Sequence, residues 1–275
     1  MLKQGNLIGL IILCVILAKA ASLQAQPFRF LDGPPNSGDT LKVMTYNIHH
    51  GANKEEIQTV KEIGLFIKQS GVDLVGLQEV DSLCGRSGKQ DQMKRLAEIT
   101  GMHYTFKRHF AYDGGAYGLG ILSRYPLEDI RGDRITSTST DGSRKTLVLL
   151  SAQVNVPGGD KLRMASVHLA LDQKTRMIQA KEILNYLPGD SPVILTGDMN
   201  AQPDNPVIDL LESRFTKTDV SLESTFPANT PDRKIDFIMV SKADIKNVTK
   251  TEVPTVQHSD HLPLISTIVM NLDPD

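Results

Sequence analysis

The chain has 275 residues, two cysteines and a formal net charge of −2 at neutral pH. This length is enough for one large domain that buries its own core. A mildly acidic chain lacks the basic stripe that drives non-specific binding to nucleic acid. This argues against a nuclease acting on long duplexes and leaves smaller phosphorylated substrates open.

Residues 1–25 are typical of a signal peptide. Lys3 precedes an apolar stretch over residues 7–18, which at about 12 residues is shorter than the roughly 20 that a membrane span needs, and small residues follow as far as Ala25. We predict cleavage after Ala25 and export to the periplasm or the medium, with no stable membrane span left. An uncleaved anchor is the alternative, whereas lipidation at Cys14 is disfavoured because a large apolar residue precedes it.

Removal of this segment leaves one cysteine, Cys84, and lowers the formal charge from −2 to −4, because it takes away Lys3 and Lys19 and no acidic residue. A single thiol cannot form an internal disulfide, so an exported domain must rely on its own core. We interpret residues 26–40 as an N-terminal lead-in and residues 41–275 as one domain, which we expect to be monomeric.

Beyond the lead-in, strand-like apolar runs alternate with amphipathic helices. Short apolar runs predict strands at residues 43–49, 73–79, 119–123, 146–156, 162–169, 193–196, 235–240 and 264–270. Apolar residues at helical spacing predict helices over residues 54–70, 90–100 and 173–187. Residues 157–160 resemble a hairpin turn. The pattern predicts a mixed α/β (α+β) chain.

Polar side chains stand at the ends of these apolar runs. They are Asn47, Glu79, His168, Asp198 with Asn200, Asp236, and Asp260 with His261. Asp236 lies inside an apolar run, where an ionised carboxylate needs a partner or a cation. Two sheets packed face to face, with helices outside, would bring many strand ends to one rim. The sequence therefore predicts a polar site there.

Clustered carboxylates at this rim predict a metal ion. Carboxylates that share one cleft cannot all stay ionised unless a divalent cation or a histidinium offsets them. Hard oxygen ligands select Mg²⁺, with Mn²⁺ as a plausible substitute and room for a second metal. His168 and His261 are then candidates for proton transfer.

In this order and spacing, Asn47, Glu79, the Gly197-Asp198-x-Asn200 segment, the Ile235-Asp236 pair and the Ser259-Asp260-His261 tripeptide resemble the endonuclease/exonuclease/phosphatase superfamily of deoxyribonuclease I-like enzymes. The resemblance spans roughly residues 41–270. It implies a four-layered α/β/β/α sandwich, with two mixed sheets face to face and helices outside. It also implies metal-dependent cleavage of a phosphoester.

The resemblance assigns a role to each of these residues. It places Glu79, Asn47 and Asp260 at the metal. It implies that Asp198 and Asn200 orient the nucleophilic water and the phosphate. It makes His261 a general base held by Asp236, and puts His168 on the phosphate. It further suggests Tyr117 and Arg144 as substrate-binding residues.

Departures from the family pattern bear on the substrate. Abasic-site endonucleases commonly carry Asn where His168 stands, so the chain resembles a secreted branch with deoxyribonucleases, sphingomyelinases and inositol-polyphosphate phosphatases. The segment from Asn47 to Gly51 is similar to relatives that act near membrane lipids, which favours a phosphorylated small molecule, lipid or nucleotide. Nucleic acid stays possible, although no basic patch is evident. His49 and His50 are not predicted to bind zinc, because no Cys or further His has matching spacing.

Three interpretations follow from the sequence. The first is a secreted Mg²⁺-dependent phosphodiesterase or phosphomonoesterase that uses a water activated by His261 and Asp236. The second is a nuclease with the same site. The third is a non-catalytic module that binds a phosphorylated ligand; such a relative would be expected to lose some of the site residues, and this chain keeps Glu79, Asp198, Asp236 and His261.

Overall fold

Two six-stranded sheets, packed face to face, form the centre of the computed structural model, which describes residues 40–137, 146–157, 161–187, 189–219, 221 and 223–271. The first sheet has the order β11 (Ile245–Glu252), β12 (Leu264–Met270), β1 (Thr40–Asn47), β2 (Leu74–Ser82), β4 (Gly115–Ser123) and β3 (His103–Tyr112). The second has the order β5 (Leu127–Ile135), β6 (Leu147–Asn155), β7 (Lys161–His168), β8 (Val193–Asp198), β10 (Asp236–Ser241) and β9 (Phe215–Lys217).

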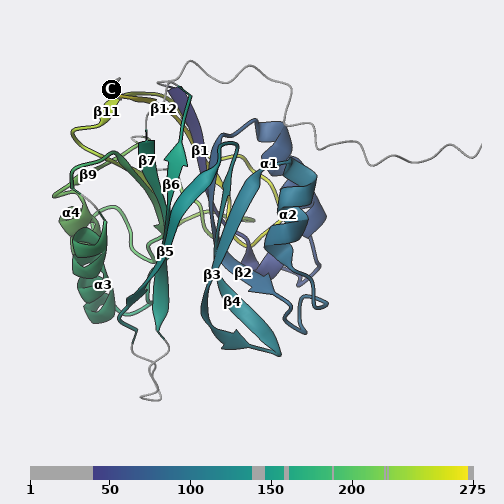
Figure 1. The fold of residues 1–275 in the computed structure, drawn as a ribbon. Coiled ribbons are helices and arrows are strands. Elements are labelled where there is room, and N and C mark those ends of the chain that lie inside the picture. Colours follow the sequence, from purple (N-terminus) through teal and green to yellow (C-terminus); the bar gives the residue numbers. More distant parts are fainter. Residues whose placement is uncertain are drawn as a thin grey trace, which may run out of the picture.

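Helices cover the outer face of each sheet (Figure 1). On the first sheet lie α1 (Val60–Ser70) and α2 (Gln92–Thr100), and on the second lie α3 (Gln173–Tyr186) and the short α4 (Pro206–Leu211). This arrangement confirms the predicted four-layered sandwich. Among the described residues, no helix is both long enough and apolar enough to cross a bilayer.

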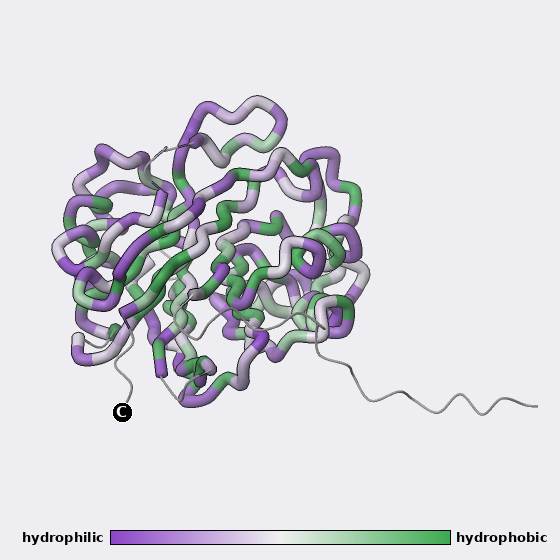
Figure 2. The backbone as a smooth tube through the Cα atoms, turned by 90° about the horizontal axis from the view of Figure 1, so that it is seen from above, coloured by the Kyte–Doolittle hydropathy of each residue, from purple (hydrophilic) through white to green (hydrophobic). Residues whose placement is uncertain are grey.

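The core has three layers that match the sandwich. Apolar side chains of both sheets meet in the middle, and a further cluster lies under the helices on each outer face. Gly76 of β2 marks a close approach between the sheets, because a Cβ there would lie 2.0 Å from Oγ1 of Thr196 in β8. Figure 2 shows hydrophobic residues mostly in the middle of the molecule and hydrophilic residues mostly along its periphery.

The topology repeats one feature in each sheet. β1 and β2 are parallel and are joined through α1, while β7 and β8 are parallel and are joined through α3. Parallel neighbours end at the same edge of a sheet. The end of β1 therefore lies beside the later part of β2, and His168 at the end of β7 pairs in register with Asp198 at the end of β8.

The structure corrects the start of the first predicted helix. We expected it at residue 54, but α1 begins at Val60. Oδ1 of Asn53 accepts hydrogen bonds from the backbone N–H of Glu55 and Ile57, which holds this segment in a turn, and Glu56 has a left-handed φ of 60°. Residues 49–51 form a single 3₁₀ turn, η1 (His49–Gly51).

Several elements of the structure were not predicted from the sequence. Strands β3, β5, β9 and β11 and helix α4 were not predicted, and β4 begins at Gly115 instead of residue 119. β5 and β11 are largely exposed edge strands with many charged residues, so they lack the apolar pattern that identifies a strand. The strands flanking the predicted hairpin turn do pair, from Asn155 with Lys161, although residues 158–160 and the proposed signal peptide lie outside the described residues.

Candidate active site

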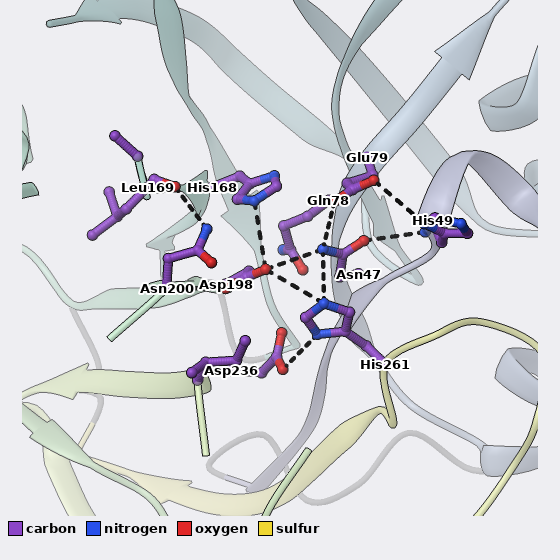
Figure 3. A network of polar contacts seen from close by, with 12 residues as sticks. Asn47, His49, Gln78, Glu79, His168, Leu169, Asp198, Asn200, Asp236 and His261 are labelled. Carbon is purple, nitrogen blue, oxygen red and sulfur yellow. Dashed lines mark hydrogen bonds and ion pairs between the residues drawn. The ribbon is translucent and has the colours of Figure 1, made fainter. Parts of the chain in front are cut away.

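The predicted polar residues meet at one rim, where the parallel pairs of the two sheets end. A pocket of about 470 Å³ opens there, within the range of small-molecule sites. Its lining includes Glu79, Phe110, Tyr117, His168, Asp198, Asn200, Phe226, Arg233, Asp260 and His261. Asn47 and Asp236 lie buried directly behind this lining (Figure 3).

Glu79 is turned toward the pocket by a local irregularity of β2. The pairing of β2 with β4 shifts register between Leu77 and Val80, and Glu79 has a left-handed φ of 58°. Such a bulge re-aims one side chain. Nδ2 of Asn47 donates a hydrogen bond to Oε1 of Glu79 at 3.1 Å, while Oδ1 of Asn47 accepts from the backbone N–H of His49. The carboxylate of Glu79 is thus held in a fixed orientation.

Asp198 contacts several of the other polar residues of the site. Its Oδ2 accepts from Nδ2 of Asn47 at 3.1 Å and lies 3.5 Å from Nε2 of His168 and 3.7 Å from Nε2 of His261. Its Oδ1 accepts from the backbone N–H of Asn200 at 2.9 Å. The side chain of Asn200 is itself fixed, because its Nδ2 donates to the carbonyl of Leu169.

Asp236 and His261 form a buried pair behind the pocket. Nδ1 of His261 lies 2.9 Å from Oδ2 of Asp236, and the same oxygen accepts from Oγ1 of Thr225 at 2.6 Å. Oδ1 of Asp236 is buried without a hydrogen-bond partner among the described residues. The ring of Phe226 packs against that of His261 with centroids 4.6 Å apart. Only Nε2 of His261 is therefore left to face Asn47 and Asp198.

These contacts shift the pKa values of the buried groups. Burial alone would lower the pKa of His261, but Asp236, Asp198 and Asp260 outweigh it and raise the pKa to about 10. Burial raises the pKa of Asp198 above its usual value, and the nearby Asp236 adds to this effect. Burial also acts to raise the pKa of Glu79, yet the neighbouring histidines and the hydrogen bond from Asn47 bring it below its usual value.

Asp260 and Tyr117 also line the pocket. Asp260 is partly exposed, and its Oδ2 lies 3.5 Å from Nδ1 of His49, whose other neighbour is Oε2 of Glu79 at 3.9 Å. Tyr117 lies in β4 beside Phe110, and the guanidinium of Arg86 lies 5.5 Å from its ring centroid. The predicted Arg144 is outside the described residues.

The donor set fits a hard divalent cation. Glu79 and Asp260 line the pocket, and both carboxylates lie near Nδ1 of His49. The ligand atoms of Asp198, Asp236 and His261 lie within 4.8 Å of one another. Oxygen-rich sets of this kind suit Mg²⁺ or Mn²⁺. The crowding of carboxylates at this rim would be offset by such a charge.

Some residues at the site were not predicted to take part. Thr225 holds Asp236, Phe226 packs on His261, and Arg233 lines the pocket with its guanidinium 4.4 Å from the Phe226 ring centroid. Ser259, noted as part of a tripeptide, donates from Oγ to the carbonyl of Asn47 at 2.7 Å and so ties that tripeptide to the end of β1. Thr225 and Phe226 belong to a loop without periodicity, so no sequence signal identifies them.

Fold and site together define a deoxyribonuclease I-like sandwich with an acid- and histidine-rich pocket. The model of the Endonuclease/Exonuclease/phosphatase family matches residues 44–261, most of the chain. The protein therefore belongs to the endonuclease/exonuclease/phosphatase family, whose members are metal-dependent phosphoesterases or nucleases.

The chain is also similar to individual proteins. The uncharacterised protein YbhP of Escherichia coli is 29% identical over 246 residues, which cover 83% of this chain and 96% of that protein. The structure of an endonuclease/exonuclease/phosphatase from Beutenbergia cavernae matches with a TM-score of 0.70 and 22% identity, covering 84% of this chain and 72% of that one. A mannosyl-6-phosphatase from Bacteroides thetaiotaomicron matches with a TM-score of 0.66 and 18% identity, covering 83% and 99%. These two structures share the fold.

The support of Asp236 by Thr225 can be tested through stability. Thr225→Val removes a donor from a buried carboxylate at nearly constant volume, so we expect a loss of about 1–3 kcal/mol in the free energy of unfolding. Urea unfolding measures this loss. The matched control is Thr249→Val on the exposed strand β11, for which a change within about 0.5 kcal/mol is expected. Equal effects of the two variants would contradict a specific role for Thr225.

Proposed function

We propose that this protein is an exported Mg²⁺-dependent phosphoesterase that hydrolyses a phosphodiester or phosphomonoester by in-line attack of water. The observation that carries the proposal is the pairing of His261 with the buried Asp236 beside Asp198, in the same pocket as Glu79. A base held by a carboxylate, next to oxygen ligands for a cation, is what hydrolysis of a phosphoester requires.

His261 is the proposed general base. Its Nδ1 is held by Asp236, which leaves Nε2, 3.7 Å from Oδ2 of Asp198, to accept a proton from water. A base must be neutral to accept a proton, and the surrounding carboxylates favour the charged ring of His261. A cation in the pocket would counter these carboxylates and restore the basic form.

Glu79, Asn47 and Asp260 are the proposed metal residues. Glu79 and Asp260 would offer carboxylate oxygens, and Asn47 orients Glu79 through its amide. When bound, Mg²⁺ supplies charge stabilisation for the phosphoryl oxygens and the leaving oxygen. Mg²⁺ commonly keeps coordination positions free for a substrate phosphate. A site with only a few protein ligands fits this requirement.

The remaining residues position the phosphoryl group. Asp198 and Asn200 are proposed to orient the attacking water and the phosphate, and the partly exposed His168 to stabilise charge on the phosphoryl oxygens. Tyr117 also lines the pocket, and Arg233 adds a cation there. Arg144 stays a sequence-based proposal for substrate binding.

The leaving group is proposed to be small or lipid-like. A pocket of about 470 Å³ holds one modest ligand, and Phe110 and Tyr117 give it an aromatic wall. A second hollow of about 230 Å³ shares Glu79, Phe110 and Tyr117 and adds Arg86 and Tyr112. Aromatic walls suit a sugar, base or acyl group. The mannosyl-6-phosphatase with a similar fold supports a phosphorylated small molecule among these classes.

Export is the part of the proposal that rests on sequence alone. Lys3 and the apolar residues 7–18 are the features that support it. Expression of the full chain in a bacterium, followed by cell fractionation and N-terminal sequencing, is expected to find a periplasmic or secreted protein that begins at Gln26. A cytoplasmic protein that retains Met1 would contradict export and leave the activity proposal untouched.

A substrate panel with metal titration tests the activity. Phosphodiesters and phosphomonoesters are assayed with Mg²⁺ or Mn²⁺, and we expect hydrolysis of at least one that EDTA abolishes. Glu79→Ala is expected to lower the rate by more than the roughly 10- to 100-fold that outer-shell changes cost at metal sites, and to shift the metal titration to higher concentration. Unchanged far-ultraviolet circular dichroism would show that the fold persists.

The matched control is Glu98→Ala, which removes a half-exposed carboxylate from α2 that lies outside the pocket. It should leave rate and metal dependence unchanged. Metal-independent hydrolysis, or a Glu79→Ala variant with an unaltered metal titration, would remove Glu79 from the proposed metal site. No hydrolysis of any substrate class would favour the non-catalytic binding module.

A further inference from the structure

A second group of side chains that could hold a metal ion lies beside the pocket. His49 and His50 follow β1, and Glu56 lies on the turn that precedes α1. Nε2 of His49 is 3.0 Å from Oε1 of Glu56, and Nε2 of His50 is 3.2 Å from Oε2 of the same carboxylate. The ligand atoms of the three residues lie within 4.8 Å of one another. Both Nε2 atoms thus face the same carboxylate, each at a different oxygen.

This arrangement is built into a closed loop. The loop is tied at its base by pairing of Ala52 with Gln58 and by the hydrogen bond from Asn53 N–H to the carbonyl of Ile57. The carbonyl of His50 accepts from Nε2 of Gln92 on α2 at 2.6 Å, and the side chain of His50 is buried. One ligand of the group is therefore anchored in the protein interior.

The backbone at this group is strained. His49, His50 and Glu56 have φ angles of 43°, 45° and 60°, in the left-handed region that residues other than glycine rarely adopt. Such strain persists where the surrounding structure enforces it and often marks a ligand site. An ion pair with Glu56, which is 66% exposed, contributes little by itself in solvent. Pairing alone therefore gives a weak reason for the strained conformation.

The nitrogen on the other side of the His49 ring faces a carboxylate. Nδ1 of His49 lies 3.5 Å from Oδ2 of Asp260. A histidine that ligates through one ring nitrogen usually donates its other N–H to a carboxylate or carbonyl, which sets the tautomer and orients the ring. Asp260 lies at ion-pair distance from Nδ1 of His49, from which a small shift would give this hydrogen bond, while Nε2 on the other side of the ring contacts Glu56.

The three donors differ in kind from those of the catalytic pocket. Two imidazoles and one carboxylate form the set that binds zinc with a position left open, whereas Mg²⁺ prefers oxygen ligands alone. Ligand atoms about 2 Å from a tetrahedral zinc ion lie about 3.3 Å apart, close to the 3.0 and 3.2 Å that separate the histidine nitrogens from Glu56. Small side-chain shifts would therefore admit the ion.

We propose that His49, His50 and Glu56 bind a divalent ion of the zinc class, at a site separate from the catalytic pocket. The prediction from sequence that His49 and His50 do not bind zinc considered Cys and His as completing ligands, and Glu56 completes the set instead. The occupied site would hold His49 with its Nδ1–H toward Asp260. It would thereby fix the loop that borders the catalytic pocket.

Zinc binding by the whole mature protein tests this proposal without any activity assay. Isothermal titration with Zn²⁺ in excess Mg²⁺, supported by the visible absorption of bound Co²⁺, is expected to show one site in the wild type. Glu56→Gln should lower the zinc affinity by at least the roughly 10- to 100-fold that even outer-shell changes cause. His50→Asn should act likewise. Glu56 is exposed, so its variant is expected to fold even where His50→Asn does not.

Two controls locate the site. His103→Asn removes a histidine of β3 that is not part of the group and should keep zinc binding. Asp198→Asn alters the catalytic cluster and should also keep the site that Glu56→Gln loses. The proposal would be overturned if the wild type did not bind zinc, or if Glu56→Gln bound zinc with the same affinity as the wild type. It would also be overturned if Asp198→Asn, and not Glu56→Gln, lost the zinc site. None of these results would bear on phosphoester hydrolysis.

Discussion

Negative charge buried at the shared rim of the two sheets is the constraint on which the site depends. Asp198 and Asp236 face each other in register across β8 and β10, and both are almost fully buried. A buried carboxylate is strongly unfavourable unless donors or cations compensate it. Here the donors are the amide of Asn47, the backbone N–H of Asn200, the hydroxyl of Thr225 and the imidazole of His261. Each contact that stabilises the charge also orients a proposed catalytic group.

The repeated strand-helix-strand unit explains why these groups meet. In each sheet a parallel pair of strands ends at the rim, and the helix that joins the pair packs on the outer face. β10 begins and the loop before β12 returns at the same rim, because both strands run antiparallel to their neighbours. Residues distant in sequence, such as Asn47 and His261, thus come within 3.4 Å.

The sequence predicts the parts of this site that lie at the ends of buried strands. An apolar run that ends in Asn47 or Asp198 predicts a buried strand and also marks the polar residue at its end as a site candidate. Thr225 and His49 lie in loops whose conformations depend on distant contacts, so no local pattern identifies their place. The same limit applies to the exposed edge strands β5 and β11. The prediction that the first helix begins at residue 54 was wrong for a local reason, because the side chain of Asn53 holds the segment in a turn.

Asp236 is proposed to act through His261 as one unit, and a double-mutant cycle can separate this coupling from independent roles. Rates of His261→Ala, Asp236→Asn and the double variant are measured on one substrate at saturating metal. Each single change is predicted to lower kcat by about 10²- to 10⁴-fold, the usual effect of losing a positioned base. The double variant should lose little more than the worse single variant. Fully additive losses would contradict this coupling, because Asp236 would then act independently of His261.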